Sequence, residues 1–165
     1  MRAHILKTFF VIATICSLAS CSSEDSVEVQ AVDSAVVQLY DYDAEELELT
    51  RQINDYRVSI GLNALQTINH ISYKSEEHNE YMIQNNVVNH DYFEERSNNI
   101  RQVLGAVKVN ENIAYNYTTP AGVLHAWLQS AGHKSNIEGE FTHFGISISE
   151  DQTGKKYYTN IFIKK

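Results

Sequence analysis

Apolar residues in the first half of the chain recur with the period of an amphipathic helix. In the segment 49–60 they stand four, three and four positions apart, at Leu49, Ile53, Tyr56 and Ile60, and Gly61 then supplies a stop. A second helix is predicted over about 69–86, where one face carries Ile71, Ser75, His78 and Met82. Both segments are expected to face a core, because each presents a single apolar stripe.

The middle of the chain has less regular patterns. The stretch 93–104 is a third helix candidate, which Gly105 stops, whereas 107–115 lacks a helical period and is predicted to be extended or irregular. A further helix is predicted to begin at Thr119 and Pro120, since threonine caps helices and proline is tolerated in the first turn. Gly132 would end this helix, and its buried face would consist of Val123, Leu124, Trp127 and Leu128.

The C-terminal pattern changes to a period of two, which is typical of strands. Turn residues at 151–154 separate two alternating segments, and the alternating apolar or β-favouring positions are Phe144, Ile146, Ile148, Tyr157, Thr159, Ile161 and Ile163. This pattern predicts a β-hairpin. Helices that come first and strands that come last predict an α+β domain.

The N-terminus has the layout of a secretory signal. Arg2 and Lys7 precede an apolar run at 8–18, which is shorter than the roughly 20 residues that cross a bilayer. The residues Leu-Ala-Ser-Cys that follow resemble a bacterial lipobox, so we expect residues 1–20 to be a lipoprotein signal peptide and Cys21 to carry acyl chains. An ordinary secretory signal with an incidental cysteine is the alternative.

The segment after this cysteine is expected to be a tether. Residues 21–43 are rich in Ser, Asp and Glu, lack a helical period and contain no aromatic residue before Tyr40, as flexible acidic linkers do. The remainder, 44–165, is long enough for one domain. Cys16 would leave with the signal, so no internal disulfide is expected.

The charge of the chain argues against nucleic acid as a partner. The formal net charge is −8, and the sequence has no run of basic residues that could neutralise phosphates. An acidic surface is also repelled by anionic lipid head groups. Contact with a membrane is therefore expected to depend on a lipidated Cys21.

Two short blocks and an upstream histidine contain the candidate chemistry. The first block reads Asn-Glu-Asn-Ile-Ala at 110–114, the second reads Trp-Leu-Gln-Ser-Ala-Gly-His-Lys-Ser-Asn-Ile at 127–137, and His90 precedes both. The two imidazoles and the carboxylate are thus too far apart in the sequence to lie on one helix. Only a folded cleft could bring them together. In content and order, the chain from about residue 45 to 165 resembles the bacterial branch of the CAP superfamily, the cysteine-rich secretory, antigen 5 and pathogenesis-related proteins.

The resemblance implies a fold and a cavity. The expected fold is an α-β-α sandwich, with a central antiparallel sheet between helical layers, and the SCP-like domain would span 44–165. In the family, the cavity residues correspond to His90, Glu111 and His133, with Ser130 nearby. Two neutral imidazoles and a carboxylate suit Zn²⁺ or another divalent metal, so these two histidines and the glutamate are the predicted metal ligands.

Other interpretations apply to individual residues. Many superfamily members have a second cavity glutamate where this chain has Ser130, and serine is a poor metal ligand. Ser130 beside His133 also suggests a nucleophile, but the usual Gly-x-Ser-x-Gly elbow is absent. Trp127 is interpreted as a core residue and Asn136 as a turn residue. A packing or surface role is the default for His70, His78, His125 and His143.

Three functions are compatible with these features. The leading hypothesis is an extracytoplasmic CAP-domain protein, anchored by lipid to a bacterial membrane, preferably the outer one, whose cavity binds a divalent metal or a lipid, glycan or protein ligand. The second is a metal-assisted hydrolase of envelope peptide or glycan, with Glu111 as base. The third is an interaction scaffold with an inherited cavity. The sequence leaves open whether the protein is an enzyme.

Overall fold

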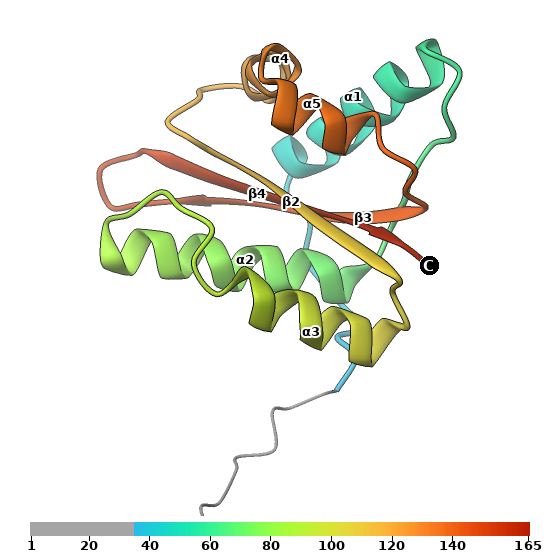
Figure 1. The fold of residues 1–165 in the computed structure, drawn as a ribbon. Helices are drawn as coiled ribbons and strands as arrows, with labels where there is room; N and C mark the ends of the chain where they lie inside the picture. The colour runs from blue at the N-terminus through green and yellow to red at the C-terminus, as the bar shows by residue number, and fades with distance from the viewer. Residues whose placement is uncertain (1–34) are drawn as a thin grey trace, which may run out of the picture. The chain divides into compact units, whose positions relative to one another are not determined.

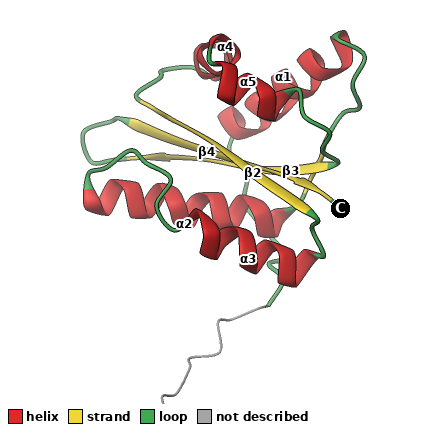
Figure 2. Cartoon of the chain, viewed as in Figure 1, coloured by secondary structure: helices red, strands yellow, loops and turns green. Residues whose placement is uncertain are grey.

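A four-stranded sheet lies between two layers of helices in the computed structural model, which describes residues 35–165 (Figure 1 and Figure 2). One face of the sheet is covered by α2 (Asn69–Asn85) and α3 (Phe93–Leu104). The other face is covered by α1 (Ala44–Ser59), α4 (Pro120–Gln129) and α5 (Ala131–Ile137). The predicted α-β-α sandwich is therefore confirmed.

Some predictions lie outside the described residues. These are the signal peptide at 1–20, the lipidated Cys21 and the first part of the tether. Within residues 35–165, no helix has both the length and the apolar character that a membrane span requires.

The strand order in the sheet is β1-β3-β4-β2. The strands β3 (His143–Glu150) and β4 (Lys156–Lys164) form the predicted hairpin, and β2 (Lys108–Tyr115) pairs antiparallel with β4. The segment that the sequence left as extended or irregular is thus a regular strand at one edge of the sheet. The other edge is β1 (Gln66–Thr67), a two-residue parallel strand that the sequence pattern did not predict.

The helix predicted to end at Gly132 is interrupted earlier. Ser130 adopts an extended conformation (φ −95°, ψ 118°), which ends α4 at Gln129. Its carbonyl then accepts the backbone N–H of Lys134 at 2.8 Å and begins α5, so Gly132 lies inside a second short helix. The prediction was wrong because nothing in the composition at Ser130 indicates a break.

Apolar side chains form a separate core on each face of the sheet. The larger cluster packs against α1, α4 and α5 and contains Trp127, which is 1 % exposed, together with Phe144 and Phe162. The cluster under α2 and α3 contains Ile71, Ile100 and Ile161. The interpretation of Trp127 as a core residue is confirmed.

A buried arginine fixes the end of α5. The Arg57 side chain is fully buried, and its guanidinium donates to the carbonyls of Asn63 (2.9 Å), Ile137 (2.6 Å) and Gly139 (3.0 Å). These bonds join the C-terminal turn of α1 to the residues that end α5. The position of α5 on the sheet is therefore set by polar contacts as well as by apolar packing.

The last part of the predicted tether packs on the domain. The backbone N–H of Val37 donates to His70 Nδ1 (3.3 Å), and the Tyr40 hydroxyl lies 2.9 Å from Ser147 Oγ. The Tyr42 hydroxyl lies 2.9 Å from Ser72 Oγ. His70 lies in α2 and is 1 % exposed, in keeping with the predicted packing role.

Gly145 determines how closely α2 approaches the sheet. A Cβ atom at this position would lie 2.3 Å from the Ser72 backbone nitrogen and 2.6 Å from Ile71 Cβ. We expect Gly145→Ala to lower the free energy of unfolding by about 2–3 kcal/mol, because the helix must move away from β3. Urea denaturation measures this loss. Gly132→Ala is the matched control, since a Cβ there meets no atom within 4 Å, and an equal loss in both variants would contradict the prediction.

Candidate functional site

The side chains of β2 alternate between the two faces of the sheet, so neighbouring motif residues lie on opposite faces. Glu111 contacts α2 and α3 through His78 and Arg96. Its neighbours Asn110 and Asn112 contact α5 instead. Successive side chains of a strand point to opposite faces, so the first block serves both layers of the sandwich.

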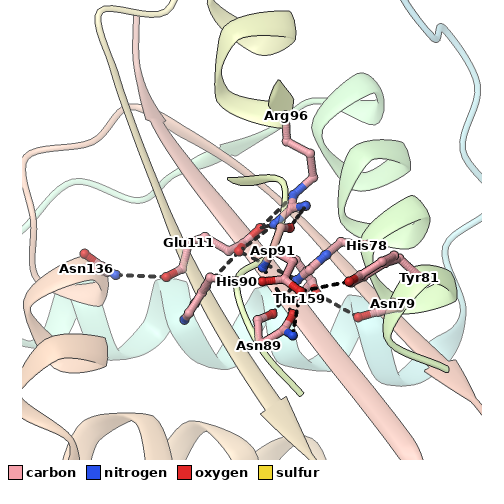
Figure 3. Close-up of polar contacts among 10 residues, drawn as sticks. All are labelled: His78, Asn79, Tyr81, Asn89, His90, Asp91, Arg96, Glu111, Asn136 and Thr159. Atoms are coloured by element: carbon pink, nitrogen blue, oxygen red, sulfur yellow. Dashed lines mark hydrogen bonds and ion pairs between the residues drawn. The ribbon is translucent and has the colours of Figure 1, made fainter. Parts of the chain in front are cut away.

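The Glu111 carboxylate is the centre of a buried polar cluster (Figure 3). Its side chain is 2 % exposed and forms a two-oxygen ion pair with Arg96, whose Nη2 donates to Oε1 (2.9 Å) and Oε2 (2.8 Å) and whose Nε donates to Oε2 (3.1 Å). His90 Nδ1 lies 2.8 Å from Oε1. A guanidinium and an imidazole N–H therefore compensate the buried charge.

His90 is oriented by this carboxylate. Because Nδ1 donates to Glu111, the lone pair of the neutral ring lies on the other nitrogen, Nε2, as in histidines that a carboxylate orients for catalysis or metal binding. The His90 side chain is 49 % exposed, so the ring is available to a ligand. Glu111 therefore has the role of an orienting group for His90.

A third histidine, His78, lies behind His90. It is fully buried, its Nε2 donates to the Asn89 carbonyl (2.9 Å), and the same atom is 3.8 Å from Glu111 Oε1. Burial lowers the pKa of His78, so this imidazole is neutral near pH 7. His78 holds the loop that contains His90. The packing role expected for His78 was therefore incomplete. The sequence analysis did not predict that Arg96 takes part in the site.

A network of asparagines joins the two motif blocks on the opposite face. Asn112 donates to the His133 carbonyl (3.0 Å), Asn136 donates to Asn112 Oδ1 (2.8 Å), and Asn110 donates to Asn136 Oδ1 (2.7 Å). The interpretation of Asn136 as a turn residue is therefore wrong. Its amide bridges α5 and β2 rather than satisfying its own turn.

Side chains also cover the free edge of β2. The outward carbonyl of Glu111 accepts from Asn136 Nδ2 (3.2 Å), and that of Ile113 accepts from Trp127 Nε1 (2.9 Å). An unpaired strand edge otherwise offers its polar groups to other chains. Trp127 thus acts both as a core residue and as a cover for the edge.

A pocket of about 290 Å³ lies between β2, α4 and α5. Neither His90 nor Glu111 lines it, so the predicted cavity residues do not share this pocket. Burial lowers the pKa of His133, and a positive charge on the nearby His90 would lower it further. The lining residues are Ile113, Ala114, Tyr115, Tyr117, Ala126, Trp127, Ser130 and His133.

The donor set does not fit the predicted three-ligand metal site. Among residues 35–165, no three His, Cys, Asp or Glu side chains are arranged so that they could hold a metal ion. Glu111 already accepts from Arg96 and His90, so its oxygens are not free ligands. The structure therefore does not assemble His90, Glu111 and His133 as a three-ligand group among the described residues, and binding of Zn²⁺ or another divalent metal stays a prediction.

The fold and the two motif blocks define a domain of the CAP type. The model of the cysteine-rich secretory protein (CAP) family matches residues 50–162, which is more than half of the chain. The chain therefore belongs to the CAP family.

The relatives are mostly longer proteins. An uncharacterised membrane protein of Bacillus subtilis (strain 168) is 34 % identical over 123 residues, which cover 72 % of this chain and 33 % of that protein. The chain thus spans about a third of that relative. An extracellular SCP-domain protein of Bacillus anthracis has a similar structure, with a TM-score of 0.65 and 26 % identity over 73 % of this chain and 40 % of that one.

An outer surface protein of Borrelia burgdorferi shares the fold over almost its whole length. Its TM-score is 0.69 at 18 % identity, with 79 % of this chain and 99 % of that chain covered. At this identity the likeness shows the fold alone.

The buried ion pair between Arg96 and Glu111 should contribute strongly to the free energy of unfolding. We expect Arg96→Met to lower the free energy of unfolding by about 3–5 kcal/mol, because Glu111 then stays buried without a cation. Urea denaturation at pH 7 measures the loss. The double variant Arg96→Met with Glu111→Gln should recover part of it, since the uncompensated charge is gone.

Arg101→Met is the matched control for this prediction. Arg101 also lies in α3, but it is exposed and donates to the Val107 carbonyl and to Ser97 rather than to a carboxylate. Its replacement should cost no more than about 0.5 kcal/mol. A loss for Arg96→Met as small as that of the control would show that the pair contributes little.

Proposed function

We propose that this protein is held outside the cytoplasm by a lipid on Cys21 and binds a sugar unit of an envelope glycan in the pocket between β2, α4 and α5. The observation that carries the proposal is the lining of this pocket. Three aromatic residues, Tyr115, Tyr117 and Trp127, line it together with Ser130 and His133.

The aromatic part of the lining suits a ring with an apolar face. A volume of about 290 Å³ is near the lower end of small-molecule sites, which start at about 300 Å³, and accommodates one ring rather than an extended lipid chain. Tyrosine and tryptophan offer large apolar faces together with a polar tip. A sugar ring matches this combination, because it has C–H groups on its faces and hydroxyl groups at its rim.

The polar part of the lining suits hydroxyl groups. Burial lowers the pKa of His133, so its imidazole is neutral near pH 7 and presents one donor and one acceptor nitrogen. Ser130 likewise donates and accepts. Neither group carries a charge that would require a charged ligand, and both lie beside the aromatic wall.

The relatives support a position outside the cytoplasm. The Bacillus anthracis protein is described as extracellular and the Bacillus subtilis protein as a membrane protein. A lipid at Cys21 would place this chain at a membrane without a spanning helix, because two or more acyl chains anchor a protein stably.

Geometry favours binding over hydrolysis. The hydrolase hypothesis needs Glu111 as a base, but this carboxylate is paired with Arg96 and buried. The nucleophile alternative needs a hydrogen bond between Ser130 and His133, and none connects them in the described part of the chain.

Replacing Tyr117 should weaken sugar binding without damaging the fold. Tyr117 is 37 % exposed and lines the pocket, so Tyr117→Ala removes a stacking face rather than a core residue. We expect the affinity for N,N′-diacetylchitobiose to fall about fivefold to tenfold, as for the loss of one aromatic contact. Isothermal titration calorimetry of the intact protein in a nonionic polyoxyethylene detergent measures this change.

The control variant is His125→Ala. His125 is on α4 like part of the pocket wall, but it is exposed and does not line the pocket, so its replacement should leave the affinity within about twofold. His133→Ala should weaken binding as Tyr117→Ala does. Absence of sugar binding in the unmodified protein would contradict the proposal and favour the scaffold hypothesis.

Cys21→Ser should release the protein from the membrane fraction. Without the thiol no acyl chain can be attached, and the acidic chain, with a formal net charge of −8, has no other strong attraction to anionic lipid. Detergent phase partitioning followed by mass spectrometry measures the loss of lipid. Cys16→Ser is the matched control and should leave partitioning unchanged, whereas an unlipidated Cys21 in the unmodified protein would refute the anchor.

A further inference from the structure

A second cavity lies on the other face of the sheet, beside α2 and the start of α3. Its volume is about 180 Å³, and it is lined by Glu77, His78, Tyr81, Tyr92 and Arg96. Neither its lining nor its position overlaps the pocket between β2, α4 and α5. It is therefore a separate candidate site.

Two tyrosine rings form a corner in this cavity. The rings of Tyr81 and Tyr92 are nearly perpendicular, with an interplanar angle of 88° and centroids 5.2 Å apart. The ring of His78 lies parallel to Tyr81, at 10° and 5.9 Å. The faces of aromatic rings carry negative potential, and cations bind within about 6 Å of a ring centroid.

The backbone conformation of Tyr92 is unfavourable and leaves its ring exposed. Tyr92 adopts the left-handed region (φ 58°, ψ 21°), which is uncommon for a bulky residue, yet its side chain is 60 % exposed and gains little from burial. Strain of this kind concentrates at functional sites. The conformation places an exposed aromatic ring beside Tyr81 instead of in the core.

The charges around the corner favour a cation. Glu77 lines the cavity and already holds the ammonium group of Lys74 at 2.7 Å. The Tyr81 hydroxyl donates to Asp91 Oδ2 (2.8 Å), which makes its ring more electron-rich (Figure 3). Arg96 is the cationic group in the lining, and its charge is compensated by the two-oxygen pair with Glu111.

The imidazole in the lining adds no opposing charge. Burial lowers the pKa of His78, which therefore remains neutral near pH 7. Its Nδ1 is buried and has no hydrogen-bond partner among residues 35–165, so protonation there would leave a buried N–H unsatisfied. The cavity thus keeps its aromatic and acidic character at neutral pH.

We propose that this cavity binds an organic ammonium group, held against the faces of Tyr81 and Tyr92 and beside the Glu77 carboxylate, which the ligand would share with Lys74. The inference goes beyond the proposed sugar pocket and does not depend on it, because the two sites share no lining residue. The ligand class is a primary or quaternary amine, free or as part of a larger molecule.

Two probes of the same shape test the role of charge. Choline carries a trimethylammonium group, and 3,3-dimethylbutanol is its neutral counterpart. In calorimetric titrations of the intact protein in a nonionic polyoxyethylene detergent, we expect choline to bind with a dissociation constant of about 1 mM and the neutral alcohol at least about tenfold more weakly. Equal affinity for both probes, or no binding of choline, would overturn the proposal.

Variants locate the site. Tyr92→Leu and Glu77→Gln should each weaken choline binding about fivefold, whereas Tyr92→Phe keeps the ring face and should retain the affinity. Glu80→Gln is the control for charge, since Glu80 is exposed on α2 but does not line the cavity. Far-UV circular dichroism checks folding, and the comparison of the two probes decides the question even if one variant is unfolded.

Tyr117→Ala separates this proposal from the sugar pocket. The variant should leave choline binding unchanged, because Tyr117 lines only the pocket on the other face. Loss of choline binding in Tyr117→Ala, with no effect of Tyr92→Leu, would place the ammonium in the sugar pocket and refute the site at Tyr81 and Tyr92. Failure of sugar binding alone would leave the ammonium site standing.

Discussion

The ion pair between Arg96 and Glu111 is the interaction on which the arrangement around β2 depends. A carboxylate buried at 2 % exposure would be strongly unfavourable without a cation and well-aligned hydrogen bonds. Arg96 supplies both, and its Nη1 also donates to the Asp91 carbonyl at 2.7 Å. One guanidinium therefore joins α3, the edge strand and the loop that contains His90. The orientation of His90 follows from this pair rather than from packing of its own ring, which is half exposed.

The opposite face of the same strand explains why the two motif blocks occur together. The first block forms an edge strand whose outward carbonyls need partners, and the second block supplies them through Trp127 Nε1 and Asn136 Nδ2. Asn136 also bonds Asn112, so the position of α5 is tied to the register of β2. The blocks are two halves of one hydrogen-bonded unit, and this requirement accounts for more of their residues than ligand binding does.

Periodicity alone predicted the elements whose side chains face a single core. The stripe through Leu49 and Ile53 gave α1, and the alternation around Ile146 and Ile161 gave the hairpin of β3 and β4. The break at Ser130 was missed because it depends on one extended residue in a segment of good helix formers. The strand β1 was missed because two residues have no measurable period.

The candidate site was harder to predict than the fold, and the reason is the two-residue period of a strand. The sequence places Glu111 between two asparagines but does not say which of the three faces which layer. The family resemblance predicted that the glutamate and both histidines share one cavity. In the structure, β2 directs the Glu111 side chain toward α3. Arg96 gave no signal, because an arginine on a polar helix face is usually solvated.

The strand β2 therefore separates two chemical environments and allows limited communication between them. The residues that line the aromatic pocket are separate from those of the Glu111 cluster. The imidazoles of His90 and His133 link the two. His90 is oriented by Glu111, and a positive charge on its ring would lower the pKa of His133, which burial already lowers. His90 therefore provides one electrostatic link between a ligand in the pocket and the buried ion pair, since it interacts with groups at both sites.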